Sequence, residues 1–402
     1  MKKRRKSAYK GYKGRSRHRR AAVVVLAAAV LLLGAAAGIY FGGLFPRIRD
    51  LIPRREPSQQ VEPAPDDNPE PAPGGDPDPV PDDNPEPTPD PGPGPGYAVI
   101  EISGEKQEYD ALYRVGDTGF EYFTYLPELG QKYAETVNKA ADALKGTAAV
   151  YDITVPLSSS VGLPDAMAGM EVFGDQKGAE EEIASLMDEN VRTVPLYETL
   201  MQHRGEYIYY RTDHHWTALG AYYAYCQFCQ TKGVEPHALT DYVKDEYPGF
   251  LGSFYRDSGE NKEMGKHPDV LEAYHPVSQN AELDLTDTEG KTYRWQIIMD
   301  VTDYDADMKY NGFIGGDNPY TVIRNPDLTD GSCCVVVKES FGNAFVPYLV
   351  DHYQTVHVID YRYWEGKLTD FVKSSGAQDV IFVNNLSAIR NSFLMGRLQG
   401  IV

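Results

Sequence analysis

Helical and strand-like spacings of apolar residues alternate along the chain from about residue 97 onward. Apolar positions at helical spacing predict a helix over residues 128–145, and the apolar run 148–155 predicts a buried strand. A second helical stretch, 178–190, leads into another apolar run at 191–196. This order of helix and strand favours a parallel sheet with helices on both faces.

The C-terminal part of the chain repeats this rhythm. Its spacing predicts three strands separated by two helices, in the order 333–338, 343–353, 355–360, 368–375 and 379–384. Parallel strands present their carboxyl ends along one edge of a sheet, where ligands bind in α/β folds. We therefore expect these strands to be neighbours and to border a site, with their ends at Lys338, Asp360 and Asn384.

The pattern changes between the two regions. Residues 236–331 are rich in Gly, Asp and aromatic residues and carry turn signals, with one strand candidate at 293–301. We interpret this stretch as a β-rich insertion that borders the site. Residues 97–402, roughly three hundred in number, then form one large α/β domain with an insertion.

The N-terminal region has the composition of a membrane anchor. Residues 1–20 contain eleven Lys or Arg and no acidic residue, and the uncharged apolar stretch 21–45 follows directly. About 20 apolar residues suffice to cross a bilayer. A cleaved signal peptide is the alternative, but its apolar core is usually shorter, at ~7–15 residues. We predict an uncleaved single-pass helix with a cytoplasmic N-terminus and an extracellular C-terminal domain.

Residues 46–96 form a predicted disordered linker. Its section 56–96 has eleven acidic residues, no basic residue and many prolines, and it contains Pro-Asp-Asp-Asn-Pro-Glu-Pro twice. Such a segment cannot bury an apolar core, and its prolines keep it extended at ~3.1 Å per residue. The net charge of −20 argues against a nucleic-acid partner, because no basic groove is visible outside the N-terminus.

One short run carries the chemistry. Thr212 to Thr217 places a carboxylate, two histidines and an indole side by side. In an extended segment, residues two apart point the same way, so Asp213 and His215 share a side while His214 points elsewhere. A carboxylate that holds an imidazole in one tautomer makes a general base able to activate a hydroxyl nucleophile.

Metal and redox sites are the alternative interpretations of the histidines and cysteines. Asp213, His214 and His215 could ligate a metal ion, but adjacent histidines diverge and no third spaced ligand is evident. Cys226 and Cys229 form a C-x-x-C, yet they lie on one helical stripe, which favours core packing over redox chemistry. We therefore predict neither a metal nor a cofactor.

Ser340 is the serine best placed to be a nucleophile. It follows the predicted strand 333–338 at a strand-to-helix turn, where a hydroxyl is exposed and backbone N–H groups can face an oxyanion. It lacks the glycine two residues earlier that a nucleophile elbow has, so a helix-capping role is an equal alternative. Ser253, in a Gly-Ser turn, is the rival, and the serines at 158–160 are weaker candidates.

Polar residues at the other strand ends suggest an oxyanion and substrate site. Asn384 or Asn385 could donate a side-chain amide to an oxyanion, or could simply close the strand with a turn. Arg362 fits either a surface ion pair or a contact with an anionic polymer. The residues alone leave both questions open.

The sequence resembles the DHHW family. Asp213-His214-His215-Trp216 carries the signature of that family, and the motifs at 339–343 and 360–363 support it. The family belongs to the wider SGNH hydrolase-like group, which includes the alginate O-acetyltransferases. The resemblance covers residues 97–402 and implies a flavodoxin-like α/β/α sandwich.

The resemblance also implies roles for individual residues. Ser340 would be the nucleophile, His215 the base and Asp213 the group that orients the base. The oxyanion and substrate site would draw on Asn384, Asn385, Gly342, Asn343, Arg362 and Trp216. In ordinary SGNH hydrolases the serine comes first and the Asp-His pair last. Here the pair precedes the serine, as it does in the alginate O-acetyltransferase type.

Three functions fit these observations. The first is an O-acyltransferase that moves acetyl or a similar group onto a cell-envelope polysaccharide. A membrane-bound partner of the O-acyltransferase type would supply the acyl group. The second is an esterase that removes such groups with the same residues. The third is a non-catalytic glycan-binding scaffold, which the presence of Ser, His, Asp and Asn together disfavours. The sequence does not separate the first two, because both pass through an acyl-serine.

Overall fold

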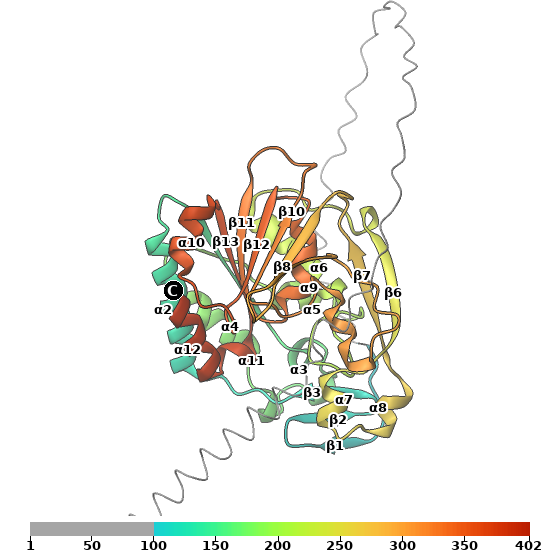
Figure 1. The fold of residues 1–402 in the computed structure, drawn as a ribbon. Helices are drawn as coiled ribbons and strands as arrows, with labels where there is room; N and C mark the ends of the chain where they lie inside the picture. The colour runs from blue at the N-terminus through green and yellow to red at the C-terminus, as the bar shows by residue number, and fades with distance from the viewer. Residues whose placement is uncertain (1–99) are drawn as a thin grey trace, which may run out of the picture. The chain divides into compact units, whose positions relative to one another are not determined.

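An eight-stranded sheet runs through the part of the chain that the computed structural model describes, residues 100–402 (Figure 1). The expected basic segment 1–20, transmembrane helix 21–45 and linker 46–96 lie outside the described residues. Among the helices of residues 100–402, none is both long enough and apolar enough to cross a membrane.

The parallel strands form one half of the sheet. In spatial order they are β5 (Val191–Thr193), β4 (Ala149–Val155), β13 (Asp379–Asn385), β11 (Cys333–Lys338) and β12 (Thr355–Asp360). Every residue of β11 and β13 is buried, as expected of central parallel strands that are covered on both faces. β11 lies between β12 and β13, which confirms that the three C-terminal strands are neighbours.

The other half of the sheet comes from the predicted insertion and is antiparallel. β10 (Tyr320–Arg324) pairs with β12, β8 (Glu282–Thr286) pairs with β10, and β9 (Thr292–Trp295) forms the edge. The expectation of a parallel sheet is therefore wrong on this side. β8 and β9 are joined by a short turn, and a short turn can connect only antiparallel neighbours.

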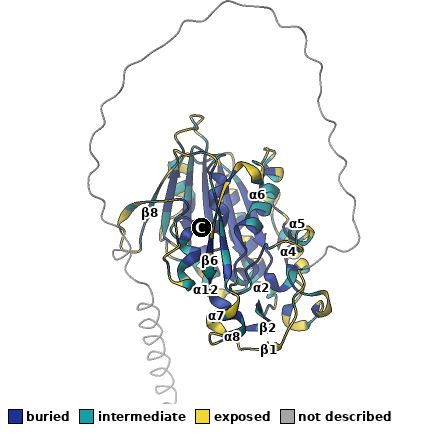
Figure 2. Ribbon diagram, turned by 90° about the vertical axis from the view of Figure 1, so that its right-hand side faces the viewer, coloured by how far each residue is buried: buried dark blue, intermediate teal, exposed yellow. Residues whose placement is uncertain are grey.

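Helices cover both faces of the sheet (Figure 1). One face carries α2 (Pro127–Ala143), α4 (Gln176–Ser185), α10 (Leu368–Ser375) and α12 (Ser392–Ile401), and the other carries α5 (Tyr197–Gln202), α6 (Ala218–Lys232) and α9 (Gly342–Leu349). Successive residues of a strand point to opposite faces, so Val336 of β11 packs in one core while Val335 and Val337 pack in the other. Figure 2 shows the buried residues concentrated along the strands between these layers.

The helix α6 follows the predicted site loop and has clear ends. The Thr217 hydroxyl accepts the Gly220 N–H at 3.3 Å at its start, and Gly233, with a φ of 80°, ends it in the left-handed conformation. Cys229 of this helix lies in the core, and Cys226 packs against that core. Both cysteines are free, so packing is the role in which the structure places them.

Smaller elements gather at the carboxyl ends of the parallel strands (Figure 1). They are a three-stranded sheet of β1 (Lys106–Glu108), β2 (Leu112–Val115) and β3 (Thr118–Glu121), with the short helices α3 (Ser158–Val161), α7 (Ser253–Asp257), α8 (Lys262–Lys266) and α11 (Leu386–Ile389). A separate antiparallel pair of strands, β6 (Val243–Phe250) with β7 (Asp269–His275), flanks the domain. The predicted site lies among these elements.

Candidate active site

The predicted pair Asp213 and His215 lies in a tight loop before α6. Tyr209 and Trp216 pair across the base of this loop. Between them the chain bends, rather than running extended as the sequence suggested. Asp213 Oδ1 accepts the backbone N–H of His215 at 2.9 Å, which is a turn in which an Asp side chain bonds the backbone two residues on. This turn, not strand alternation, brings the two side chains together.

A continuous chain of hydrogen bonds joins Asp213, His215 and Ser340. His215 Nδ1 lies 2.6 Å from Asp213 Oδ1, and His215 Nε2 lies 2.7 Å from Ser340 Oγ. The carboxylate favours the tautomer in which Nδ1 carries the proton, so the Nε2 lone pair faces the serine hydroxyl. All three residues are buried. The arrangement can take up the hydroxyl proton while the serine oxygen attacks a carbonyl carbon.

Asp213 stays ionised because the loop surrounds it with donors and imidazoles. Burial by itself raises the pKa of a carboxyl, but His215, His214 and the hydrogen bonds hold the pKa of Asp213 well below its ordinary range. Asp213 Oδ2 also accepts the backbone N–H of Ser253 at 2.8 Å. Gly252 leaves room for this contact, since a Cβ there would lie 2.1 Å from Oδ2. The Gly-Ser pair therefore forms part of the wall around the carboxylate.

Tyr310 holds the plane of the His215 ring. The two rings are stacked, with centroids 3.9 Å apart and planes 12° from parallel. The Tyr310 hydroxyl donates to the backbone oxygen of Ser340 at 3.2 Å, so one side chain contacts both residues. Tyr310 lies in the 3₁₀ segment Ala306–Gly312. Sequence reasoning missed it because tyrosines and other aromatic residues are frequent throughout 236–331.

Glu339 ties the serine turn to the neighbouring strand. Its buried carboxylate accepts the backbone N–H of Phe341 at 3.2 Å through one oxygen and that of Asn385 at 3.1 Å through the other. The Ser340 hydroxyl lies 3.3 Å from the first of these oxygens. Burial raises the pKa of Glu339, and Arg362 opposes that shift. The bonds fix Ser340 relative to the end of β13.

Two of the residues expected in an oxyanion or substrate site are completely buried. The Trp216 indole donates to the backbone oxygen of Phe341 at 3.0 Å, and the Asn384 amide donates to the Tyr133 hydroxyl at 3.3 Å. Asn384 faces α2 because alternation along β13 turns it away from the face that carries α9. Both side chains are engaged in contacts within the protein, and the substrate role expected for them stays a prediction.

Asn385 and Gly342 lie beside the serine turn. The Asn385 side-chain oxygen accepts the Ala388 N–H at 2.8 Å and caps α11. No hydrogen-bond partner for its Nδ2 occurs among residues 100–402, so this amide remains available to a ligand. Gly342 begins α9, and a Cβ there would lie 2.5 Å from the Cβ of Lys338. Its role is close packing of the turn.

Arg362 and Asn343 belong to a network of charges beneath the serine turn. Arg362 pairs with Asp360 at 2.7 Å and with Asp317 at 2.8 Å. Lys338 pairs with the same carboxylates at 2.8 and 3.1 Å, and the Asn343 amide donates to Asp317 at 2.9 Å. Of the two interpretations of Arg362, the ion pair is the one observed. The network holds the start of α9 against the ends of β11 and β12.

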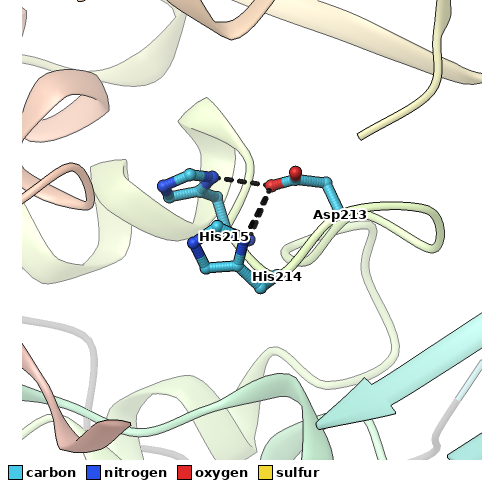
Figure 3. Close-up of side chains that lie close together, drawn as sticks. All are labelled: Asp213, His214 and His215. Carbon is cyan, nitrogen blue, oxygen red and sulfur yellow. Dashed lines mark hydrogen bonds and ion pairs between the residues drawn. The ribbon is translucent and has the colours of Figure 1, made fainter. Parts of the chain in front are cut away.

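Ser253 and His214 form a second serine–histidine pair next to the first. Ser253 Oγ lies 2.6 Å from His214 Nδ1. Figure 3 shows both histidines turned toward Asp213, and their ring centroids are 3.9 Å apart. The Nδ1 of His214 is 3.7 Å from Asp213 Oδ1, too far for a hydrogen bond. The expectation that His214 points elsewhere is wrong, because the bend brings consecutive side chains to one side.

The same three loop residues offer atoms that a metal could use. One ligand atom each from Asp213, His214 and His215 lie within 4.8 Å of one another. Three of the four ring nitrogens and the carboxylate, however, already make hydrogen bonds among themselves and to Ser253 and Ser340. A metal ion would have to displace these bonds, so the geometry favours the proton-transfer interpretation.

The comparisons with known proteins place the chain in a family. Residues 98–359 match the family model described as DHHW protein. The chain belongs to the DHHW family. A DHHW family protein from Eubacterium siraeum has a similar structure, with 26% identity and a TM-score of 0.68 over 75% of this chain and 99% of that one. Bacillus cereus PatB1 shares the fold, with 19% identity and a TM-score of 0.58 over 72% and 98%. No curated protein matches the sequence.

The strand order of this DHHW domain explains why the Asp-His pair precedes the serine. Counted from β11, the parallel strands lie in space as second, first, third, fourth and fifth, which is a flavodoxin-like order. The chain enters this arrangement at the fourth strand, β4. The loop that carries Asp213 follows β5 and therefore precedes β11 in the sequence. The ends of β5 and β11 nevertheless lie at the same edge of the sheet.

Proposed function

We propose that this DHHW protein is an O-acyltransferase that moves an acyl group through Ser340 onto a hydroxyl of a cell-envelope polysaccharide. The hydrogen-bonded chain from Asp213 through His215 to Ser340 Oγ is the observation that carries the proposal. In this arrangement an imidazole of defined tautomer activates a serine hydroxyl, and that activation is what acyl transfer through serine requires.

Both halves of the reaction use the same three residues. Ser340 Oγ attacks the acyl carbonyl carbon of the donor while its proton moves to His215 Nε2, and the imidazolium then protonates the leaving group. A polysaccharide hydroxyl next attacks the acyl-serine and gives its proton to His215. The bond to Ser340 Oγ breaks, and that oxygen recovers the proton. Asp213 remains ionised and stabilises the imidazolium in each half.

Asn385 is our candidate for the oxyanion donor. Its side-chain oxygen is occupied by the cap of α11, which leaves its Nδ2 hydrogens for a ligand, and its backbone is tied to Glu339 next to Ser340. One such donor contributes about 3 kcal/mol to transition-state stabilisation in comparable sites. Asn384, which bonds Tyr133, is not included in this proposal.

An esterase would use the same residues with water in place of the sugar hydroxyl. A cavity of about 500 Å³ lined by His214 and Ser253 offers room for a sugar unit, which either enzyme has to bind. A purely glycan-binding scaffold would have no use for a buried imidazole bonded to a serine hydroxyl. We give acyl transfer priority because the Asp-His pair precedes the serine in the sequence, as it does in the alginate O-acetyltransferase type.

Covalent labelling tests the nucleophile directly. PatB1 of Bacillus cereus has been solved with a sulfonyl adduct. We expect an aromatic sulfonyl fluoride to modify Ser340 of the native protein, because His215 makes the Ser340 Oγ nucleophilic. Peptide mass spectrometry detects the modified residue. Labelling should disappear in Ser340→Ala. A label on Ser253 instead, or equal labelling of the Ser340→Ala protein, would contradict the proposed nucleophile.

We also propose that residues 21–45 anchor the protein, with the basic segment 1–20 inside the cell and the enzyme domain outside. The acyl donor is cytoplasmic, so a membrane-bound O-acyltransferase-type partner would pass the acyl group outward. Protease added to intact cells should then remove residues 97–402 and spare an epitope placed before residue 20. Recovery of the domain in the medium, cleaved after residue 40, would indicate a secreted protein.

A further inference from the structure

A cavity of about 500 Å³ lies next to the candidate base. Its lining includes Glu121 at the end of β3, His214, Ser253 and Phe254 of α7, and Arg390 after α11. His214 connects this cavity to the catalytic residues, since its ring centroid is 3.9 Å from that of His215. No side chain of these cavity residues takes part in the reaction steps at Ser340, so their arrangement needs its own explanation.

Only one ring nitrogen of His214 has a hydrogen-bond partner among residues 100–402. Ser253 Oγ accepts the backbone N–H of His214 at 3.2 Å and lies 2.6 Å from its Nδ1. A serine hydroxyl has one hydrogen and two lone pairs, so this contact fits either tautomer of the ring. In both tautomers Nε2 keeps one unused position, either an N–H or a lone pair.

His214 is a neutral imidazole in this position. Burial and the adjacent His215 lower the pKa of His214, although Asp213 and Glu121 oppose the shift. A neutral imidazole of this kind needs a hydrogen-bond partner for Nε2, not a counter-ion.

Glu121 supplies an unused acceptor in the same cavity. One of its oxygens accepts the Ser387 hydroxyl. The other, Oε1, is buried and has no hydrogen-bond partner within the described chain. Buried polar atoms are rarely left unpaired in folded proteins, so a donor from outside the chain is the simplest explanation.

We propose that Glu121 and His214 form an acceptor subsite that binds the hydroxyls of a sugar unit next to the acyl-serine, an inference that rests on the proposed transferase function. A hydroxyl both donates and accepts, so a sugar can pair with Glu121 Oε1 and with His214 Nε2 in either tautomer of the ring. A carboxylate or phosphate dianion has no hydrogen for Glu121. The Phe254 ring adds an apolar wall suited to the face of a sugar.

The hydroxyls held by Glu121 and His214 are not the reacting one. A neighbouring hydroxyl of the same sugar attacks the carbonyl carbon of acyl-Ser340 while His215 Nε2 takes its proton. The acyl bond to Ser340 Oγ breaks, and His215 returns the proton to that oxygen. The subsite therefore determines which alcohol competes with water for the acyl group. The transfer needs no reactant other than the acyl-enzyme and the sugar.

The partition of the acyl-enzyme tests the subsite. The full-length protein is supplied with p-nitrophenyl acetate and equal concentrations of methyl β-glucoside or 1-propanol, and acetylated alcohol is measured relative to free acetate. We expect the native protein to acetylate the glucoside in preference to propanol. His214→Ala and Glu121→Gln should each lower the glucoside-to-acetate ratio by about tenfold, as expected for the loss of a buried hydrogen bond, and leave the propanol ratio unchanged. Both products arise from one acyl-enzyme, so slower acylation cancels from the ratio.

The controls separate the subsite from the chemistry. His237→Ala replaces a partly exposed histidine outside the cavity and should keep the native ratios. His214→Gln retains a side-chain N–H and should recover part of the glucoside ratio. Acylation with no preference for the glucoside, or an unchanged preference in both variants, would overturn the subsite and leave the proposed function standing. If Ser340→Ala were as active as the native protein, the proposed function would fall, and the subsite with it.

Discussion

Replacing Ser340 with alanine is expected to lower kcat for acyl transfer by about 10⁴-fold or more. The hydroxyl is the atom on which both half-reactions depend, and the Asp213–His215 pair alone cannot form an acyl-enzyme. The measurement is the release of p-nitrophenol from p-nitrophenyl acetate, together with acetyl transfer to methyl β-glucoside. The Ser340 hydroxyl makes hydrogen bonds only with His215 and Glu339 among the described residues, so the free energy of unfolding in urea should change little.

Ser253→Ala provides the comparison for this prediction, because Ser253 is the other serine bonded to a histidine of the loop. It should retain p-nitrophenol release far above the level of Ser340→Ala. A large loss in Ser253→Ala with an active Ser340→Ala would reverse the two assignments. It would also make His214 the base.

Replacing Asp213 with asparagine is expected to lower kcat by a similar amount, about 10⁴-fold. The carboxylate accepts two N–H groups of His215 and one of Ser253, whereas an amide has one acceptor oxygen and places its NH₂ against a donor. His215 would then lose the tautomer that leaves Nε2 free for the serine. The same assays measure this change, and folding is checked by urea unfolding.

The stability of the Asp213→Asn protein should also depend differently on pH. The folded-state pKa of Asp213 is held well below its ordinary value of about 3.9, so its ionised form stabilises the native protein fully above that pH. That contribution is lost as the pH falls through the lowered pKa. The difference in unfolding free energy between native and variant should therefore shrink as the pH is lowered from about 4. Asp245→Asn, which breaks the more exposed contact of 2.7 Å with His275, is the matched control and should keep native activity.

A difference in unfolding free energy that stayed constant between neutral and acidic pH would contradict the charged state assigned to Asp213. Retention of most of the activity in Asp213→Asn would mean that Tyr310 and the loop backbone suffice to orient His215. Either result would weaken the proposed proton-transfer chain without bearing on the fold.

The periodicity of apolar residues located the parallel half of the sheet closely. The predicted strands 333–338 and 355–360 have the observed bounds of β11 and β12, and the helix 128–145 corresponds to Pro127–Ala143. Buried parallel strands are continuous apolar runs between polar residues, so their limits are visible in the sequence. The run 191–196 is an exception, since β5 ends at Thr193. Pro195 cannot donate a ladder hydrogen bond, which accounts for the shorter strand.

The antiparallel half of the sheet was not predictable in the same way. β8, β9 and β10 are short, and their pattern shows that they are strands but not which strands they pair with. Their pairing depends on the free edge of β12, which exists only once the C-terminal strands have assembled. The sequence therefore indicated a β-rich insertion and not its attachment to the main sheet.

By itself, the sequence determined the chemistry available: a carboxylate, an imidazole and a serine whose local motifs mark them out, although 125 positions separate His215 from Ser340. The tertiary structure decided how these groups are surrounded. The residues around them come from segments without a local signature. Tyr310 stacks on His215, Gly252 and Ser253 lie against Asp213, and Glu121 at the end of β3 lines the cavity beside His214. Local spacing determines helices, strands and turns, but contacts between distant segments depend on how the elements pack. Only the folded chain could therefore show that His214 faces a cavity of its own.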